Sequence, residues 1–207
     1  DTTKSKIEEN GGIAIVVEAD LSDAANADNL FEAADRLGPL HGLVNAAAQP
    51  GAQADFLMLS ATDVEDIWRI NFLAAMVCSQ RAIERMSVSR GGEGGRIVNI
   101  SSQSASSGGY RRVSYATSKA SLEALTVALA SEFAEQGILV NALSPGLIET
   151  VNSPVLDSPR RKRAEESVPL GRFGLPQEVA EAVAWLMSPG SSYMTGAVLP
   201  LNGGRRV

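Results

Sequence analysis

Arg96-Ile-Val-Asn-Ile-Ser101 begins the part of the sequence that decides the fold. Its apolar and β-branched residues predict a buried strand. The segment from Ser114 to Glu135 follows, with the composition and length of a helix, and Ile138-Leu-Val-Asn-Ala142 predicts a second strand. Two strands joined by a long helix are typical of a βαβ unit, in which the strands run parallel.

The same alternation continues on both sides of this unit. Three further short strands are predicted at 13–18, 42–45 and 198–201, and three further helices at 26–37, 61–86 and 176–187. Thr62-Asp-Val-Glu65 matches a capping box at the start of one helix, and Pro176 fits the first turn of another. Residues 1–10 resemble the tail of a helix closed by Gly11-Gly12. We predict a doubly wound α/β fold, with a parallel sheet covered by helices on both faces, in a single domain spanning 1–207.

Composition excludes several classes of protein. The chain has 207 residues, 44% of them hydrophobic, a formal charge of −6 and a single cysteine, Cys78. This is an ordinary globular composition, with no apolar run long enough for a membrane helix. An acidic chain argues against nucleic-acid binding, and one cysteine allows no internal disulfide, so we expect a reducing, cytoplasmic location. Cys78 is interpreted as core filler, and we assign no metal-ligating residues.

Ligands of open α/β sheets bind beyond the carboxyl ends of the strands. Small or polar residues follow four predicted strands, at 20–21, 45–48, 101–102 and 144–146. They suit the floor of a cleft. The only histidine, His41, precedes its strand and is interpreted as structural.

Tyr115-Ala-Thr-Ser-Lys119 places a phenol and an ammonium four residues apart on one helix face. A nearby cation favours the phenolate. Lowering the pKa of a tyrosine from about 10 to about 7 takes roughly 4 kcal/mol, and a general acid/base active at neutral pH results. Ser102 follows a strand and precedes Tyr115 by 13 residues, so its hydroxyl could bind the oxygen that Tyr115 protonates. Asn71 fits either a catalytic or a core amide.

These residues and others resemble the short-chain dehydrogenase/reductase family, in the family's order along nearly the whole chain. The matching segments are Ala19-Asp20-Leu21, Leu43-Val44-Asn45-Ala46-Ala47, Asn71-Phe72, Ile97-Val98-Asn99-Ile100-Ser101-Ser102, Tyr115 to Lys119, Asn141 to Thr150, Pro169-Leu170-Gly171-Arg172, and Thr195-Gly196 through Asn202-Gly203-Gly204.

The resemblance implies a role for each matched position. Tyr115 is then the acid/base, Lys119 lowers its pKa and binds the nicotinamide ribose, Ser102 positions the substrate oxygen, and Asn71 holds a proton-relaying water. The implied cofactor is NAD or NADP, and its remaining contacts are Asp20 and Leu21 beside the adenine, Asn45, Ala46 and Ala47 along the adenosine, and Pro145, Gly146, Ile148 and Thr150 at the nicotinamide. The implied reaction moves a hydride between an alcohol carbon and the nicotinamide.

The chain departs from the family in two places. Asn45-Ala46-Ala47-Ala48 replaces the usual Asn-Asn-Ala-Gly, which removes backbone freedom near the cofactor. The family's first two strands and its glycine-rich turn have no counterpart, and the 91–95 segment follows a helix, the reverse of a phosphate cradle. We therefore expect roughly 40 further residues before Asp1, the size of one βαβ step. The choice between NAD and NADP stays open.

Several functional alternatives stay open. The substrate is predicted to be a small secondary alcohol or ketone, with a 3-oxoacyl-carrier-protein reductase, a sugar or polyol dehydrogenase and a non-catalytic binding scaffold as alternatives. Acidic residues at 131–136 weaken docking of an acidic carrier protein. The 149–172 region reads as a substrate lid, and its basic run 160–163 as either a basic mouth or a solvated helix. Tyr110 to Arg112 suit an anionic or hydroxylated substrate and an exposed turn equally.

A homotetramer is expected. The two long helices carry small-residue faces suited to pairing across subunits, at Ala74, Ala75, Cys78, Ala120, Ala124 and Ala128.

Overall fold

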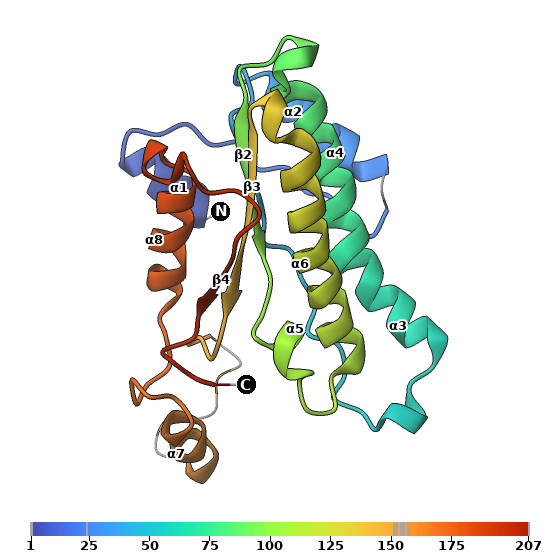
Figure 1. Ribbon diagram of the computed structural model, residues 1–207, viewed down its shortest axis with the longest axis vertical. Helices are drawn as coiled ribbons and strands as arrows, with labels where there is room; N and C mark the ends of the chain where they lie inside the picture. Colours follow the sequence, from blue (N-terminus) through green and yellow to red (C-terminus); the bar gives the residue numbers. More distant parts are fainter. Residues whose placement is uncertain (1, 24, 151–152, 154–155, 157, 207) are drawn as a thin grey trace.

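A computed structural model describes residues 2–23, 25–150, 153, 156 and 158–206. Its sheet has four strands in the order β1-β2-β3-β4, all parallel (Figure 1). The strands are β1 (Gly42–Asn45), β2 (Gly95–Ile100), β3 (Ile138–Pro145) and β4 (Val198–Leu201). The predicted parallel α/β fold is therefore confirmed.

The βαβ unit read first from the sequence forms the centre of the sheet. Strand β2 pairs with β3 from Gly95↔Ile138 to Ile100↔Leu143, and α6 (Val113–Phe133) connects them. Successive side chains of β2 face opposite sides, so Ile97 enters one core and Val98 the other. Burial on both sides explains why these strands read as nearly continuous apolar runs.

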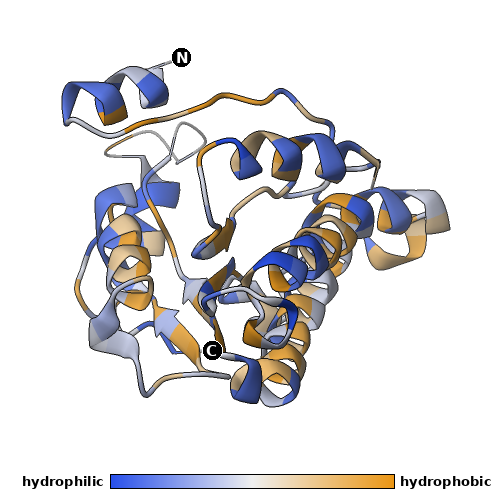
Figure 2. Cartoon of the chain, turned by 90° about the horizontal axis from the view of Figure 1, so that it is seen from above, coloured by the Kyte–Doolittle hydropathy of each residue, from blue (hydrophilic) through white to orange (hydrophobic). Residues whose placement is uncertain are grey.

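Helices cover both faces of the sheet (Figure 2). On one face α2 (Ala25–Asp35), α4 (Ala74–Met86) and α6 pack on Ile97, Ile138 and Val140. On the other face α8 (Pro176–Leu186) packs on Val98 and Leu143. This two-sided arrangement is the doubly wound packing that the sequence predicts.

The remaining helices and turns are short. They are α1 (Thr2–Glu9), α3 (Ala61–Trp68), a π-helical turn (Arg69–Leu73), α5 (Ser104–Ser107), α7 (Pro159–Glu166), and 3₁₀ turns at Phe56–Met58, Val88–Arg90, Ala134–Gln136 and Pro189–Ser191. Helix α1 ends before Gly11, whose φ of 79° confirms the predicted glycine stop.

The strand predicted at 13–18 is wrong. This segment has no assigned strand, and the side chain of Ile13 is 81% exposed. A strand needs a hydrogen-bonded ladder as well as β-branched residues. Among the described residues, β1 pairs with β2 alone, so the segment has no strand beside it.

The helix predicted at 61–86 is interrupted. Its capping box is formed by Ser60 and Asp63, two residues earlier than expected, because the Ser60 hydroxyl accepts from the Asp63 N–H and the carboxylate of Asp63 accepts from the Ser60 N–H. The π-helical turn then separates α3 from α4, with Asn71 at its centre. Such turns disturb the regular backbone ladder and frequently occur at functional sites.

Across the described residues, no helix is both long and apolar enough to cross a membrane.

Candidate active site

The loops that follow the four strands, with α5 and α7, gather at the lower end of the sheet in Figure 1. Ser102 lies in the loop between β2 and α5, Tyr115 lies in the first turn of α6, and Lys119 follows one turn later. The short helix α5 packs on α6. Asn71 reaches the same helix from the π-helical turn, where its side-chain amide donates to Ser118 Oγ at 3.1 Å.

Lys119 is held inside this site. Its side chain is 2% exposed, and Nζ donates to the carbonyl of Ile100, at the end of β2, at 2.7 Å. Nζ lies 5.9 Å from the centroid of the Tyr115 ring. Burial lowers the pKa of Lys119 to about 8, so the ammonium is still mostly protonated at pH 7. A buried cation beside a half-exposed tyrosine is the arrangement that the sequence predicts.

The two serines after β2 have different partners. Ser101 is buried, and its hydroxyl contacts the Glu123 carboxylate at 2.7 Å and the Lys119 carbonyl at 3.3 Å. The Ser102 oxygen instead accepts from the Ser104 N–H at 3.1 Å. Acceptance at this oxygen leaves the proton of Ser102 available to an oxygen of a ligand.

Asn71 is 1% exposed, and its amide joins two parts of the site. Oδ1 accepts from the Gln49 N–H at 2.7 Å, and Nδ2 donates to the Gln49 carbonyl at 2.9 Å. These bonds fix the loop after β1 against α6. The side chain is therefore a satisfied core amide, one of the two interpretations that the sequence left open.

Part of the predicted adenosine contact set lines a cavity of about 70 Å³ between the loop after β1 and α4. The predicted residues on its wall are Leu21, Asn45, Ala46 and Ala47. Asp20 does not line this cavity. Its carboxylate accepts from the Ser22 N–H at 2.9 Å, which lowers the pKa of Asp20.

The side chain of Asn45 points into the protein. Its Nδ2 donates to Asn99 Oδ1 at 2.8 Å, and Asn99 in turn donates to Thr126 at 2.9 Å. Asn99 and Thr126 are fully buried. This polar chain joins β1, β2 and α6, and no role for Asn99 or Thr126 is predicted from the sequence alone. An asparagine in the middle of an apolar strand was the available signal.

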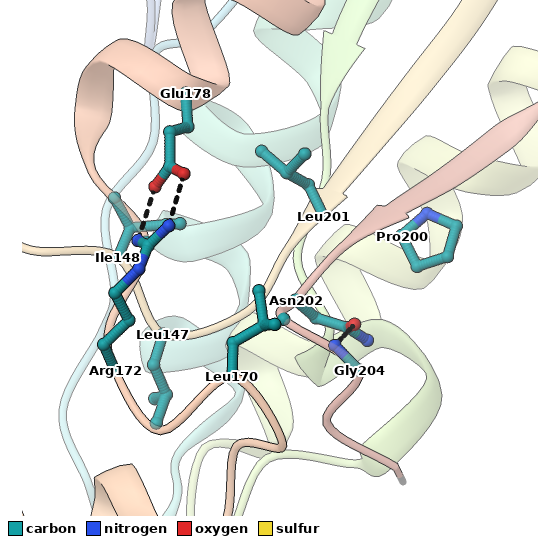
Figure 3. A pocket seen from close by; sticks show the side chains of 11 residues that line it. Leu147, Ile148, Leu170, Arg172, Glu178, Pro200, Leu201, Asn202 and Gly204 are labelled. Atoms are coloured by element: carbon teal, nitrogen blue, oxygen red, sulfur yellow. Dashed lines mark hydrogen bonds and ion pairs between the residues drawn. The ribbon is translucent and has the colours of Figure 1, made fainter.

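Ile148 of the predicted nicotinamide set lines a second cavity, of about 220 Å³ (Figure 3). Arg172 and Glu178 close one side, with guanidinium-to-carboxylate distances of 2.7 and 2.8 Å. Pairing with Arg172 lowers the pKa of Glu178 to about 2. Pro145 and Thr150 lie outside this lining. The ion pair was not predicted, because the two charges meet only when the loop before α8 folds back.

Gly146 lies against the end of the chain. A Cβ at this position would come within 2.8 Å of the Asn202 Cβ and 3.3 Å of Gln103 Oε1. Glycine is therefore required for the close approach of this loop to the segment after β4.

The basic run 160–163 lies on α7, and one of its members is not solvated. Arg161 is buried, contacts the carboxylates of Glu149 at 2.6 Å and Glu165 at 2.5 Å, and stacks 3.8 Å from the centroid of Phe173. The solvated-helix reading holds for Arg160, Lys162 and Arg163, which are exposed, and is wrong for Arg161. Spacing alone could not tell which cation of the run faces inward.

Cys78 is buried in the core, as expected, and burial raises the pKa of its thiol. His41 lies at the amino end of β1 with Nε2 3.3 Å from the Glu93 carboxylate, away from the site.

The parallel sheet, with Tyr115 and Lys119 near its carboxyl end, defines a Rossmann-like α/β protein with a candidate acid/base pair. A family profile described as "Enoyl-(Acyl carrier protein) reductase" matches residues 1–206. The chain belongs to the short-chain dehydrogenase/reductase family, whose members use NAD or NADP.

Individual relatives and solved structures agree with this assignment. "Uncharacterized oxidoreductase YgfF" of Escherichia coli is 38% identical over 204 residues, covering 96% of this chain and 82% of the relative. "Glucose 1-dehydrogenase 2" of Bacillus subtilis is 34% identical, covering 99% and 79%. The crystal structure of acetoin dehydrogenase YohF from Salmonella typhimurium superposes with a TM-score of 0.88 at 35% identity, covering 99% and 80%. A blue fluorescent protein from a metagenomic library, in complex with NADPH, gives 0.89 at 31% identity, covering 100% and 81%.

Proposed function

We propose that this chain interconverts a secondary alcohol and a ketone with NAD or NADP, using Tyr115 as the acid/base. The observation that carries the proposal is the buried ammonium of Lys119, which lies 5.9 Å from the Tyr115 ring and is fixed to the end of β2. A cation kept in a site of low dielectric favours the phenolate over the phenol.

The side chains divide the reaction among them. The Ser102 hydroxyl donates a hydrogen bond to the carbonyl oxygen of the ketone and orients it, keeping its own proton. Tyr115 gives its phenolic proton to that oxygen during reduction and takes it back during oxidation. Lys119 stabilises the phenolate that remains. Asn71 keeps the loop after β1 and α6 in fixed relation through its bonds to Gln49 and Ser118.

The residues present fit a nicotinamide nucleotide. Ile148 lines the cavity of about 220 Å³ beside the loop after β3, and Gly146 lets this loop pack closely on the segment after β4. Leu21, Asn45, Ala46 and Ala47 lie around the cavity assigned to the adenosine. With Lys119 at the ribose and Pro145 and Thr150 beside the nicotinamide, these groups would hold the cofactor, which supplies or accepts the hydride when bound. The proposal also includes Asp20 as a residue that would contact the adenine.

The substrate class has two candidates. A small hydroxyketone or sugar is supported by the similarity to an acetoin dehydrogenase and a glucose 1-dehydrogenase. A 3-oxoacyl thioester is supported by 34% identity to the "3-oxoacyl-[acyl-carrier-protein] reductase FabG" of Pseudomonas aeruginosa, over 99% of this chain and 80% of the relative. The acidic helix end at 131–136 favours the first candidate, because a carrier protein is itself acidic.

The proposal includes a homotetramer in the cytoplasm. Ala124, Val127 and Ala128 form an exposed apolar strip on α6, which supports pairing with a second copy. The subunit-pairing face predicted on α4 is wrong, since Ala74, Ala75 and Cys78 are buried in this chain's own core. They pack inward because α4 lies against α2 and β1.

The test is an absorbance assay of nicotinamide oxidation with NADH or NADPH on acetoin, a sugar ketone and an acetoacetyl thioester. We expect turnover with at least one ketone. Coenzyme binding without turnover of any ketone would favour a non-catalytic scaffold and contradict the proposal.

A further inference from the structure

Gln103 follows Ser102 directly and joins the serine loop to the nicotinamide loop. Its side chain is 5% exposed, and its backbone N–H donates to the Pro145 carbonyl at 2.9 Å. The position of the Ser102 hydroxyl therefore depends on a residue whose backbone is tied to β3. The Gln103 side chain is in turn held by Arg205, near the carboxyl end of the chain.

Both ends of the Gln103 amide are bound by Arg205. Nε2 donates to the Arg205 carbonyl at 2.9 Å, and Arg205 Nη1 donates to Oε1 at 3.2 Å. Two reciprocal bonds to one residue fix the amide in one orientation. Because the guanidinium is charged, its bond is stronger than one between neutral groups.

Arg205 also connects this pair to the lid region. Its Nε donates to the Ser167 hydroxyl, at the end of α7, at 3.0 Å. The Asn202 amide donates to the Arg205 carbonyl at 3.0 Å, and the Leu170 N–H donates to the Gly203 carbonyl at 3.1 Å. Residues 202–206, here called the C-terminal strap, thus lie between α7 and the serine loop. Figure 3 shows part of the strap, Asn202 and Gly204, beside Leu170.

The strap also packs on the nicotinamide loop. Gly146 N–H donates to the Leu201 carbonyl at 3.0 Å, and the missing Cβ of Gly146 makes room for Asn202 and Gln103. Arg205 therefore bonds to α7 directly, through Ser167, and reaches Ser102 and the 145–146 loop through Gln103 and Asn202.

We propose that Gln103 and Arg205 are positioning residues for hydride transfer. They hold the Ser102 hydroxyl and the 145–146 loop at a fixed separation, so that a ketone bound to Ser102 lies correctly for the nicotinamide. The inference rests on the proposed function. Displacement of reacting groups by about 1 Å can cost on the order of 100-fold in rate, so the contribution appears mainly in kcat.

The test compares Gln103→Ala, Arg205→Ala and the double variant with the wild type, on the ketone of the panel above that the wild type reduces fastest. We expect kcat to fall about 10- to 100-fold in each single variant, with a smaller change in KM. The double variant should be no slower than the worse single variant, because the two residues act as one unit. Arg206→Ala is the matched control, since that neighbouring arginine is exposed to solvent.

A second readout separates positioning from folding. With coenzyme deuterated at the transferred hydrogen, the isotope effect on kcat should rise in Arg205→Ala, because hydride transfer becomes the slow step. Arg205→Lys and Gln103→Glu, which keep a charged donor and an acceptor, should recover part of kcat if the alanine variants fold poorly.

Three results would overturn the inference. Alanine variants with wild-type kcat and isotope effect, or kcat losses that add independently in the double variant, would reduce Gln103 and Arg205 to structural contacts. An inactive wild type would remove the proposed function and this inference with it, whereas an active wild type with an equally active Arg205→Ala would remove only the inference.

Discussion

The burial that places Lys119 beside Tyr115 also makes the free energy of unfolding depend on pH. The folded state lowers the pKa of this lysine from 10.5 to about 8, while the unfolded chain keeps the ordinary value. Between these two values the unfolded state binds more protons than the folded state. The free energy of unfolding must therefore rise as pH increases from 8 to 10.5, and the penalty is fully present below pH 8.

We predict that this rise is lost in Lys119→Met. Relative to that variant, the wild type should gain up to about 3 kcal/mol of unfolding free energy between pH 8 and pH 10.5. Urea unfolding of the coenzyme-free protein at a series of pH values measures it, with Lys6→Met, an exposed lysine of α1, as the control. A wild type and a Lys119→Met variant with parallel pH profiles would contradict the buried cation.

At the scale of elements, one buried side chain joins α7 to two neighbouring loops. Arg161 joins Glu149 in the nicotinamide loop, Glu165 on its own helix and Phe173 in the loop before α8. Loss of the cation leaves these two partly exposed carboxylates without the partner that holds them near α7.

We predict that Arg161→Met lowers the free energy of unfolding, and that Arg160→Met leaves it nearly unchanged. Arg160 is the matched control because it is adjacent in the run and exposed. Thermal unfolding of the two variants at pH 7 gives the comparison. Equal midpoints would mean that the buried arginine does not anchor the helix.

Elements whose signal is local were predictable from sequence. The βαβ unit around β2, α6 and β3 follows from two apolar runs and a helix of suitable length, and the pair Tyr115 and Lys119 follows from helical spacing. The strand expected at 13–18 failed because pairing is not a local property. The prediction of one continuous helix over 61–86 failed at the π-helical turn, because the Asn71 amide is satisfied by Gln49, which is distant in sequence.

The same difference between local signals and long-range contacts explains how much of the candidate site was predictable from the sequence. Types and order of the residues that carry the chemistry were readable, since each follows a strand or lies on one helix face. The bonds that orient them were not. Gln103 and Arg205 are 102 positions apart, and Arg161 is distinguished from Arg160 only by the direction in which α7 presents it.

At the scale of the whole molecule, the outer face of α6 predicts assembly. Val127 is 51% exposed there, between the exposed Ala124 and Ala128. A continuous apolar strip on a surface helix is typical of an interface between subunits.

We predict a particle of four times the mass of the single chain by light scattering, and a smaller one for Val127→Glu, because the interface would then bury an unpaired charge. Val88→Glu is the control, since Val88 is 49% exposed on a 3₁₀ turn away from this strip. A wild-type monomer at micromolar concentration would exclude the tetramer.

The central claim is that the Tyr115 hydroxyl transfers the proton that accompanies the hydride. Removing that hydroxyl in Tyr115→Phe leaves the ring and its packing in place, so the fold should persist. The decisive measurement is coenzyme-dependent ketone reduction by Tyr115→Phe, beside Tyr110→Phe, whose ring is exposed in the preceding turn. We predict a loss of kcat on the order of 100-fold or more in Tyr115→Phe and wild-type turnover in Tyr110→Phe. A Tyr115→Phe variant that reduces the ketone at the wild-type rate would contradict this claim.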